Sequence, residues 1–145
     1  MAKLDFYWDE WDEDSKIDRS ELGEESIKIP QLHHKYYKFY SAERLTLTKQ
    51  KKQLQLLKKQ KFLWYMGTIS EEELVDLGWD PNPLKILKQD ILMYVDADKD
   101  VQDVELKVEY IKEKVDFLES VIKTLSIRSY QINNAINWEK FKVGI

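Results

Sequence analysis

The chain has 145 residues, a formal net charge of −4 and no cysteine. This length allows one domain, and the lack of cysteine excludes disulfides and thiolate metal sites. Its uninterrupted apolar runs, such as residues 62–66, are far shorter than the ~20 residues that a membrane-spanning helix needs. The N-terminus is acidic where a signal peptide would be apolar. We therefore expect an intracellular protein with no membrane association.

Charge is distributed unevenly along the chain. Residues 1–30 carry ten acids and four bases, and residues 31–66 carry nine bases and one acid. Residues 67–100 carry nine acids and three bases, and residues 101–145 carry seven of each. Local charge, more than net charge, governs attraction to a polyanion. The basic segment 31–66 therefore permits nucleic-acid binding despite the acidic balance of the whole chain.

Residues 1–30 form an acidic segment with interspersed aromatic residues. Dense like charge opposes packing, so we expect a solvated, partly flexible arm. The alternative is a short acidic–aromatic segment that contacts a basic surface, either the chain's own residues 31–66 or a partner. Pro30 suits the first turn of a helix, which predicts that the next element begins at about residue 31.

Residues 31–66 contain no Gly or Pro and are predicted to form one basic helix. Alternating steps of four and three residues place the following side chains on one seam: Tyr36, Tyr40, Leu47, Leu54, Leu57 and Trp64. The remaining positions of this seam are Glu43, Gln50 and Lys61. Cations form two stripes at seven-residue spacing, one of Arg44, Lys51 and Lys58 and one of Lys52 and Lys59. We expect the helix to pack through its seam and to display these cations.

Residues 49–65 combine lysines with aromatic residues, a combination that is typical of proteins that bind single-stranded nucleic acid. Six lysines lie within residues 49–61, and three aromatic residues lie within residues 62–65. Lysines neutralise phosphates, and Trp64 and Tyr65 can stack on unpaired bases. No array of side chains is arranged to contact base edges, so we expect no sequence specificity. The alternatives are that the lysine face is only solvated and that Trp64 is a core residue.

The C-terminal half contains the clearest periodicity. Residues 67–83 are predicted to be a connector with one short helix, which Ser70 and Glu73 cap and Gly78 ends. Residues 84–145 are predicted to be a helical oligomerisation region. From Val101 to Ile136 a heptad seam runs along one long helix, and its proposed contact residues are Val108, Ile111, Val115, Leu118, Ile122, Leu125 and Ile132. One helix cannot bury this seam alone, so either the 31–66 helix folds back on it or copies of the chain pack together.

No catalytic residue, cofactor or metal site is predicted. No glycine precedes a Lys-Ser/Thr pair, as a nucleotide-binding loop requires. His33 and His34 are adjacent, so on a helix they point in different directions and do not form a metal site. The acids at 96, 98 and 100 resemble the start of a calcium loop, but the required Gly and Glu are replaced by Val101 and Lys107. These acids are instead predicted to cap the long helix.

A series of sequence blocks carries a family resemblance. The most specific block runs from Asp96 to Val101 and leads into the long C-terminal helix. Residues 118–123, 131–136 and 138–142 continue it, and residues 29–36 and 84–90 precede it. In this order, from about residue 15 to the C-terminus, the blocks resemble the UvsY family of phage recombination mediators.

This resemblance implies a single-stranded DNA site. The family binds DNA through a Lys-Ala-Arg-Leu-type motif shortly before an aromatic pair and a glycine. Here residues 59–62 stand in that place, ahead of Trp64, Tyr65 and Gly67. Lys59 and Lys61 thus take the two cationic positions. Lysine in place of arginine keeps the charge but loses bidentate phosphate contacts.

The resemblance also implies an assembly and partners. We expect an all-α fold, with an elongated protomer made of a basic helix in the N-terminal half and a long heptad-patterned helix in the C-terminal half. The resemblance implies a homo-hexameric or homo-heptameric ring that binds single-stranded DNA in the cytoplasm of a phage-infected host cell. Such a ring loads a UvsX-type recombinase onto strands covered by the phage single-strand-binding protein, without catalysis or cofactors. The alternatives are a helical oligomeric scaffold that does not bind DNA and, with the least support, an enzyme.

Overall fold

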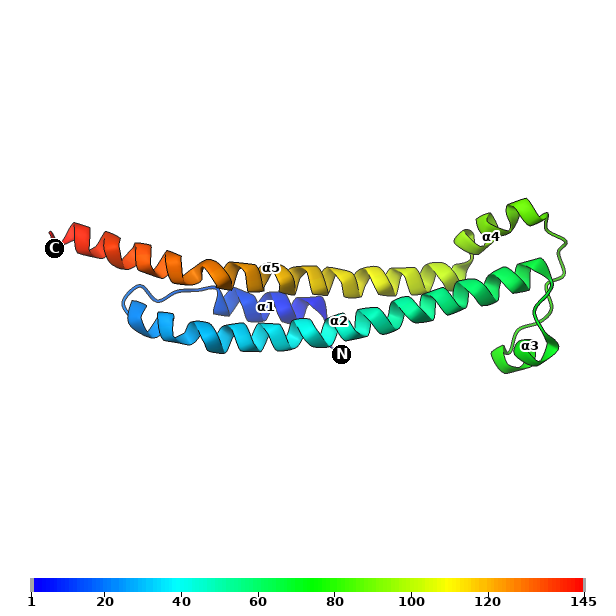
Figure 1. Cartoon of the computed structure of the whole chain (residues 1–145), viewed down its shortest axis with the longest axis horizontal. Helices are drawn as coiled ribbons and strands as arrows, with labels where there is room; N and C mark the ends of the chain where they lie inside the picture. Colours follow the sequence, from blue (N-terminus) through cyan, green and yellow to red (C-terminus); the bar gives the residue numbers. More distant parts are fainter. Residues whose placement is uncertain (1, 145) are drawn as a thin grey trace. The chain divides into compact units, whose positions relative to one another are not determined.

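The computed structural model describes residues 2–144 and contains only helices among them (Figure 1). In chain order these are α1 (Leu4–Asp14), α2 (Leu22–Met66), α3 (Glu71–Leu77), the short 3-10 helix η1 (Lys88–Asp90), α4 (Ile91–Ala97) and α5 (Lys99–Lys142). The chain divides into two compact units. The first unit contains the chain up to Leu45 and from Ile111 onward, and the second unit is Thr46–Tyr110. The all-α prediction is confirmed.

The N-terminal segment forms helix α1, whereas the sequence predicted a solvated arm. Its apolar side chains follow helical spacing, so Leu4, Tyr7 and Trp11 share a face despite the intervening acids. Tyr7 is only 4% exposed, and the Trp11 ring packs edge-on against Tyr36 of α2 at 5.4 Å. Helix α1 therefore contacts the chain's own basic segment, as the alternative interpretation of this region expected.

Helix α2 begins at Leu22, nine residues before the predicted start. Glu24 and Glu25 lie in its first turn, where carboxylates interact favourably with the helix dipole. Pro30 lies inside the helix, where it removes one backbone hydrogen bond without ending the helix. At the other end Gly67 has a left-handed φ of 79°, and Thr68 N donates to the Leu63 carbonyl at 3.0 Å. This is the glycine-dependent termination expected after residue 66.

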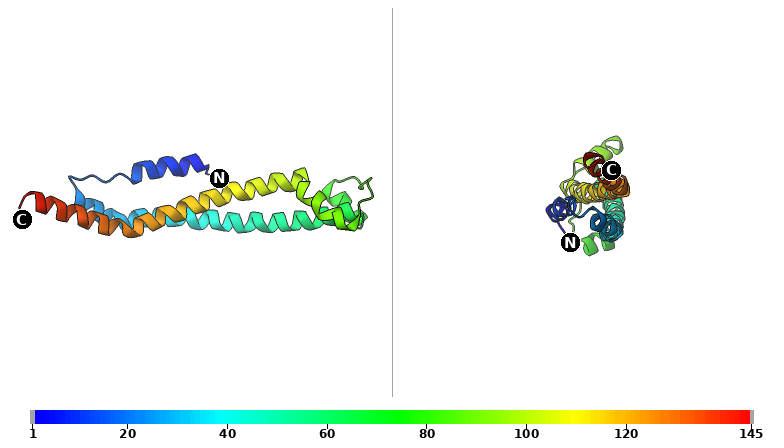
Figure 2. Two further views of the ribbon diagram at one scale, coloured as in Figure 1. Left: turned by 90° about the horizontal axis from the view of Figure 1, so that it is seen from above. Right: turned by 90° about the vertical axis from the view of Figure 1, so that its left-hand side faces the viewer.

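In the first unit, α1 lies beside α2 and α5 (Figures 1 and 2), and the three helices share a core of Tyr7, Tyr36, Leu118, Val121 and Leu125. The residues predicted to join copies of the chain are already covered within one chain. Six are buried, namely Val108, Ile111, Val115, Leu118, Leu125 and Ile132, and Ile122 is half-buried. The fold-back alternative therefore describes this seam, because its burial needs no second copy.

A buried ion pair lies among these helices. Lys114 of α5 is fully buried, and its Nζ lies 3.1 Å from Glu43 Oε1 and 3.0 Å from Oε2. Tyr7 of α1 donates its hydroxyl to Glu43 Oε1 at 2.9 Å. Burial, together with this hydrogen bond to a carboxylate, raises the pKa of Tyr7 well above its ordinary value. One glutamate of α2 thus holds both α1 and α5.

The second unit contains the remaining part of α2, the connector, and the first part of α5. Ile91, Val95 and Val101 form its core, with Leu54 and Leu57 of α2 packed against them. Helices α3 and α4 lie on different sides of the end of α2 (Figures 1 and 2). Ser70 accepts a hydrogen bond from Glu73 N at 3.2 Å and caps α3, as predicted.

Candidate nucleic-acid interface

Three of the predicted DNA-binding lysines are exposed on α2 within the second unit. Lys51, Lys52 and Lys59 point to solvent and form no ion pair with any other residue between 2 and 144. Lys52 and Lys59 are seven residues apart, about 10 Å along the helix axis, and therefore lie on nearly the same face. Lysines without protein partners are available to neutralise phosphates, because their binding does not require an existing ion pair to break.

Two further predicted cations are partly engaged. Lys58 Nζ lies 3.2 Å from Glu105 Oε1 of α5, with both side chains about two-fifths exposed. Arg44, which belongs to the first unit, is exposed and places its guanidinium 5.4 Å from the ring centre of Tyr40. An exposed ion pair is weak, so Lys58 can exchange its carboxylate for a phosphate at low cost. Both residues remain candidates for phosphate contacts.

Lys61 differs from these lysines because it is buried. Only 7% of the residue is exposed, and its Nζ lies 3.0 Å from Asp100 Oδ2 and 3.3 Å from Asp98 Oδ2. The ammonium also lies 4.3 Å from the ring centre of Trp79, a favourable cation–aromatic distance. The sequence predicted a DNA-binding cation at this position. In the structure the charge of Lys61 is already neutralised inside the second unit.

The two predicted stacking residues belong to the same buried arrangement. Trp64 Nε1 donates to the carbonyl oxygen of Asp80 at 2.7 Å, and Tyr65 donates its hydroxyl to Asp98 Oδ2 at 2.7 Å. Both residues are half-buried, and Tyr65 packs against the core of the second unit. We call these residues with Lys61, Trp79, Asp98 and Asp100 the Lys61 cluster.

Asp98 connects the Lys61 cluster to the start of α5. Its Oδ1 accepts hydrogen bonds from the backbone N–H groups of Asp100 at 2.9 Å and Val101 at 3.2 Å, which caps the helix as predicted. Burial raises the pKa of Asp98, but hydrogen bonds from Tyr65 and Val101 and the charge of Lys61 outweigh it. The net result is a pKa below the ordinary value.

This depressed pKa predicts a loss of stability in acid. A group whose pKa is lower in the folded protein stabilises it above the unfolded pKa, and this stabilisation is lost as the pH falls through the folded pKa. For Asp98 the loss begins below about pH 4. We expect Asp98→Asn, which keeps a capping oxygen, to be less stable than the wild type at pH 7, with the difference shrinking towards pH 3. Urea unfolding followed by tryptophan fluorescence at both pH values measures this, and an equal difference at both would contradict it.

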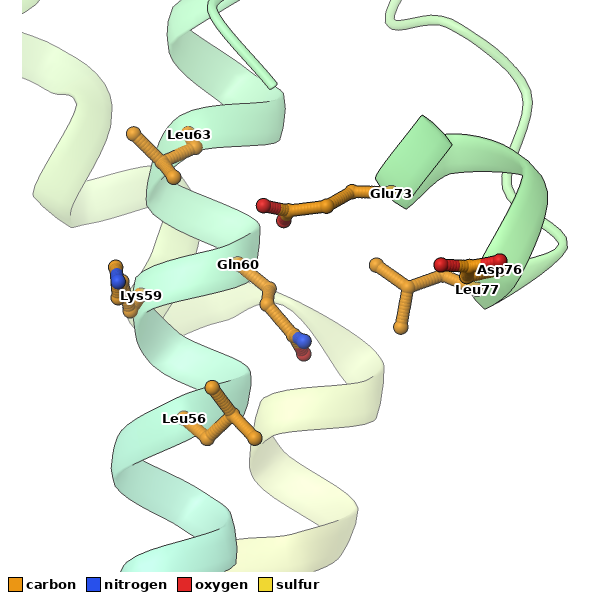
Figure 3. Close-up of a pocket in the computed structure, with 7 residues that line it drawn as sticks. All are labelled: Leu56, Lys59, Gln60, Leu63, Glu73, Asp76 and Leu77. Carbon is orange, nitrogen blue, oxygen red and sulfur yellow. The ribbon is translucent and has the colours of Figure 1, made fainter. Parts of the chain in front are cut away.

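A groove lies between α2 and α3 beside Lys59 (Figure 3). It has a volume of about 210 Å³, with Leu56, Lys59, Gln60 and Leu63 on the α2 side and Glu73, Asp76 and Leu77 on the α3 side. The carboxylates of α3 therefore form one side of the groove. Lys59 therefore lies at the edge of a groove whose opposite side carries two carboxylates.

The described residues also bear on two other kinds of site, a metal site and a membrane-spanning helix. No group of three or more His, Asp or Glu side chains within residues 2–144 is placed to hold a metal ion. Asp98 and Asp100, which resemble a calcium loop in sequence, are paired with Lys61. Across the described part of the chain, no helix has both the length and the apolar character needed to cross a membrane.

Comparison with solved structures gives close matches in fold. The chain aligns with crystal structures of the bacteriophage T4 recombination mediator protein UvsY from three lattice types. For lattice type II the TM-score is 0.86 at 19% identity, covering 99% of both chains. For lattice type IV it is 0.84 at 18% identity, covering 97% of this chain and 99% of the other. For lattice type I the TM-score is 0.80 at 19% identity, covering 93% of this chain and 97% of the other.

Sequence comparison identifies the family. A search of curated proteins gives no match. The family described as "Recombination, repair and ssDNA binding protein UvsY" matches residues 10–145, which is nearly the whole chain. This match includes the Lys61 cluster and all the exposed lysines of α2 described above. The chain belongs to the UvsY family.

Proposed function

We propose that this protein is a recombination mediator that binds single-stranded DNA without sequence specificity. The observation that carries the proposal is a group of three exposed lysines on α2, Lys51, Lys52 and Lys59, which form no ion pair within residues 2–144, in a chain of the UvsY family. Lys58, whose ion pair with Glu105 is about two-fifths exposed, is a further candidate in the same unit, and Arg44 is a separate candidate in the first unit. Lysines bind phosphates but do not distinguish bases, so every sequence is bound by the same contacts.

The Lys61 cluster supports this interface from within. Lys61 and Tyr65 hold the end of α2 to the capped start of α5 through Asp98. A helix whose end is fixed keeps its exposed lysines in a constant arrangement, which reduces the entropy lost when a strand binds. In this proposal Lys61, Trp64 and Tyr65 shape the interface, and the exposed lysines contact the DNA.

Assembly of several copies provides the affinity. Apolar side chains remain exposed on the part of α5 in the first unit, namely Ile127, Tyr130, Trp138 and Phe141, and these replace the buried seam as candidates for contacts between copies. We propose a ring of six or seven protomers, as the resemblance implies. Repetition of one weak lysine site around such a ring raises the total affinity for a single strand through avidity.

Loading of a recombinase is the activity that follows from this arrangement. The ring is proposed to hold a strand, loosen the phage single-strand-binding protein and admit a UvsX-type recombinase. The measurement is the rate at which recombinase displaces a fluorescent single-strand-binding protein from single-stranded DNA. We expect the wild type to accelerate displacement and a variant with Lys51, Lys52 and Lys59 replaced by alanine to fail. No acceleration at saturating wild-type protein would contradict the mediator proposal.

A further inference from the structure

The acids of α1 divide into two groups with different surroundings. Asp9 and Asp12 are exposed, whereas Glu10 and Asp14 face the basic segment. Lys35 Nζ lies 2.6 Å from Glu10 Oε2 and 2.6 Å from Asp14 Oδ2. Two inward carboxylates of α1 are therefore bound to one lysine of α2.

Asp14 also accepts a hydrogen bond from a tyrosine hydroxyl. Tyr36 donates to Asp14 Oδ2 at 2.7 Å, so this oxygen accepts from both Lys35 and Tyr36. Burial raises the pKa of Asp14, but the hydrogen bonds from these two residues and the charges of Lys35 and Arg128 outweigh it and lower the pKa overall. The surroundings of Asp14 thus strongly favour an anion.

Arg128 of α5 adds a guanidinium to this surface. It is 2% exposed, and its Nη2 donates to the carbonyl oxygen of Ser15, directly after α1, at 2.7 Å. Its Nη1 is buried and has no hydrogen-bond partner within residues 2–144. Its guanidinium lies 5.5 Å from the ring centre of Trp11. A buried guanidinium with an unused donor is costly, and it becomes less costly when an oxyanion accepts from it.

These donors match the chemistry of a phosphate group. The ammonium of Lys35 and the hydroxyl of Tyr36 converge on the Asp14 carboxylate, and the charge of Arg128, which contacts the residue after α1, also acts on Asp14. All three groups donate to phosphate oxygens as they do to carboxylates. We propose that Lys35, Tyr36 and Arg128 form a second binding site for the phosphates of single-stranded DNA, which α1 covers when DNA is absent. Glu10 and Asp14 take the place of phosphates, so α1 and the strand exclude each other.

The packing of α1 is compatible with exchange. Tyr7 is the one buried residue among its 11 residues, and a helix of this length is marginal in water without tertiary contacts. Its docking therefore depends on a limited set of contacts, of which the ion pairs to Lys35 are two. A polyanion that binds Lys35 and Arg128 removes those ion pairs and weakens the docking of α1.

This inference rests on the proposed binding of single-stranded DNA and has its own test. The inner variant is Glu10→Gln with Asp14→Asn, and the matched control is Asp9→Asn with Asp12→Asn, which removes the same charge from the exposed face of α1. The probe is a labelled oligothymidylate, and its anisotropy is measured against salt. Two released phosphate contacts correspond to an increase in affinity on the order of tenfold at 0.1 M salt and to a steeper salt dependence. We expect this for the inner variant and little change for the control.

Two further variants distinguish failure of the covered site from failure of the α2 interface. In a background with Lys51, Lys52 and Lys59 replaced by alanine, the inner variant should still bind more tightly than its parent. Adding Lys35→Gln to the inner variant should remove much of the gain. Equal affinities of the inner and control variants, with the wild type still binding, would overturn the covered site and leave the α2 interface intact. Absence of binding by every variant and the wild type would overturn both.

Hydrogen exchange provides a readout on α1 itself. On the wild-type protein, saturating oligothymidylate is expected to increase exchange of the α1 backbone amides, because the strand displaces the helix. The core amides of α5 should remain protected, which shows that the unit stays folded. Unchanged or slower exchange in α1 on DNA binding would contradict the proposal, since a covering helix must leave when its site is filled.

Discussion

Replacing Glu43 with alanine is expected to destabilise the first unit by about 3–5 kcal/mol, because it leaves a buried lysine without its carboxylate. Lys114 is fully buried, and its Nζ lies 3.1 Å from Glu43 Oε1 and 3.0 Å from Glu43 Oε2. The hydroxyl of Tyr7 loses its acceptor in the same variant, which adds the cost of an unsatisfied buried donor. Urea unfolding monitored by circular dichroism measures the change in the free energy of unfolding.

Two controls isolate the buried charge as the cause. The variant Tyr7→Phe with Glu43→Leu and Lys114→Met removes the ion pair and the tyrosine hydroxyl together and should recover most of the loss, because apolar replacements of a buried ion pair are often neutral or stabilising. Glu13→Ala breaks an ion pair with Lys16 whose side chains are 75% and 65% exposed and should change the free energy of unfolding little, because exposed ion pairs contribute little to stability. A similarly small cost for Glu43→Ala would show that Lys114 finds water or another partner.

Replacing Lys51, Lys52 and Lys59 together by alanine is expected to weaken binding to single-stranded DNA by at least about 100-fold at 0.1 M salt. Each phosphate contact on a single strand contributes about 0.7 to the slope of log affinity against log salt, so three contacts account for about two log units at that salt concentration. The three side chains are exposed and unpaired within the described residues, and the free energy of unfolding should change little. Anisotropy titrations over several salt concentrations give both the affinity and the slope.

The chain offers two matched comparisons for this variant. Replacing Lys85, Lys88 and Lys107 by alanine removes the same charge from exposed positions of the second unit. It should change the slope of log affinity against log salt by less than the roughly 0.7 that one phosphate contact contributes. The variant Lys61→Met tests the buried lysine. The replacement should reduce the free energy of unfolding, because Asp98 loses its ion pair, and it should leave the salt dependence of DNA binding unchanged. If the Lys61 variant alone loses a phosphate contact, the exposed lysines are not the interface.

Much of the helical fold follows from local sequence patterns. The long α5, the capped α3 and the end of α2 before Gly67 are all predicted, because apolar periodicity, capping residues and a left-handed glycine act over a few residues. The start of α2 at Leu22 and the folding of α1 were not predicted. In both cases tertiary packing outweighs an unfavourable local signal, namely a proline at residue 30 and a dense run of acids before residue 15.

The candidate site was harder to predict, because its decisive contacts are distant in sequence. One arrangement recurs within residues 2–144, a carboxylate that accepts from a lysine and a tyrosine. Examples are Glu43 with Lys114 and Tyr7, Asp14 with Lys35 and Tyr36, and Asp98 with Lys61 and Tyr65. Nothing local in the sequence pairs these residues. One usable signal was present, since Glu43 and Lys61 are the charged residues on the mainly apolar seam of α2. Charges at such positions predict burial with a partner more than exposure to DNA.

Anisotropy of a labelled single strand, compared with duplex of equal length at low and moderate salt, is the most direct test of the proposed function. The proposed function predicts tighter binding to the single strand than to duplex. The exposed lysines of α2 predict an affinity that falls steeply with salt, by about 0.7 log units per phosphate contact for each log unit of salt. They also predict the same affinity for strands of different sequence. Absence of binding even at low salt would contradict the account and would leave a helical oligomeric scaffold as the better description of the protein.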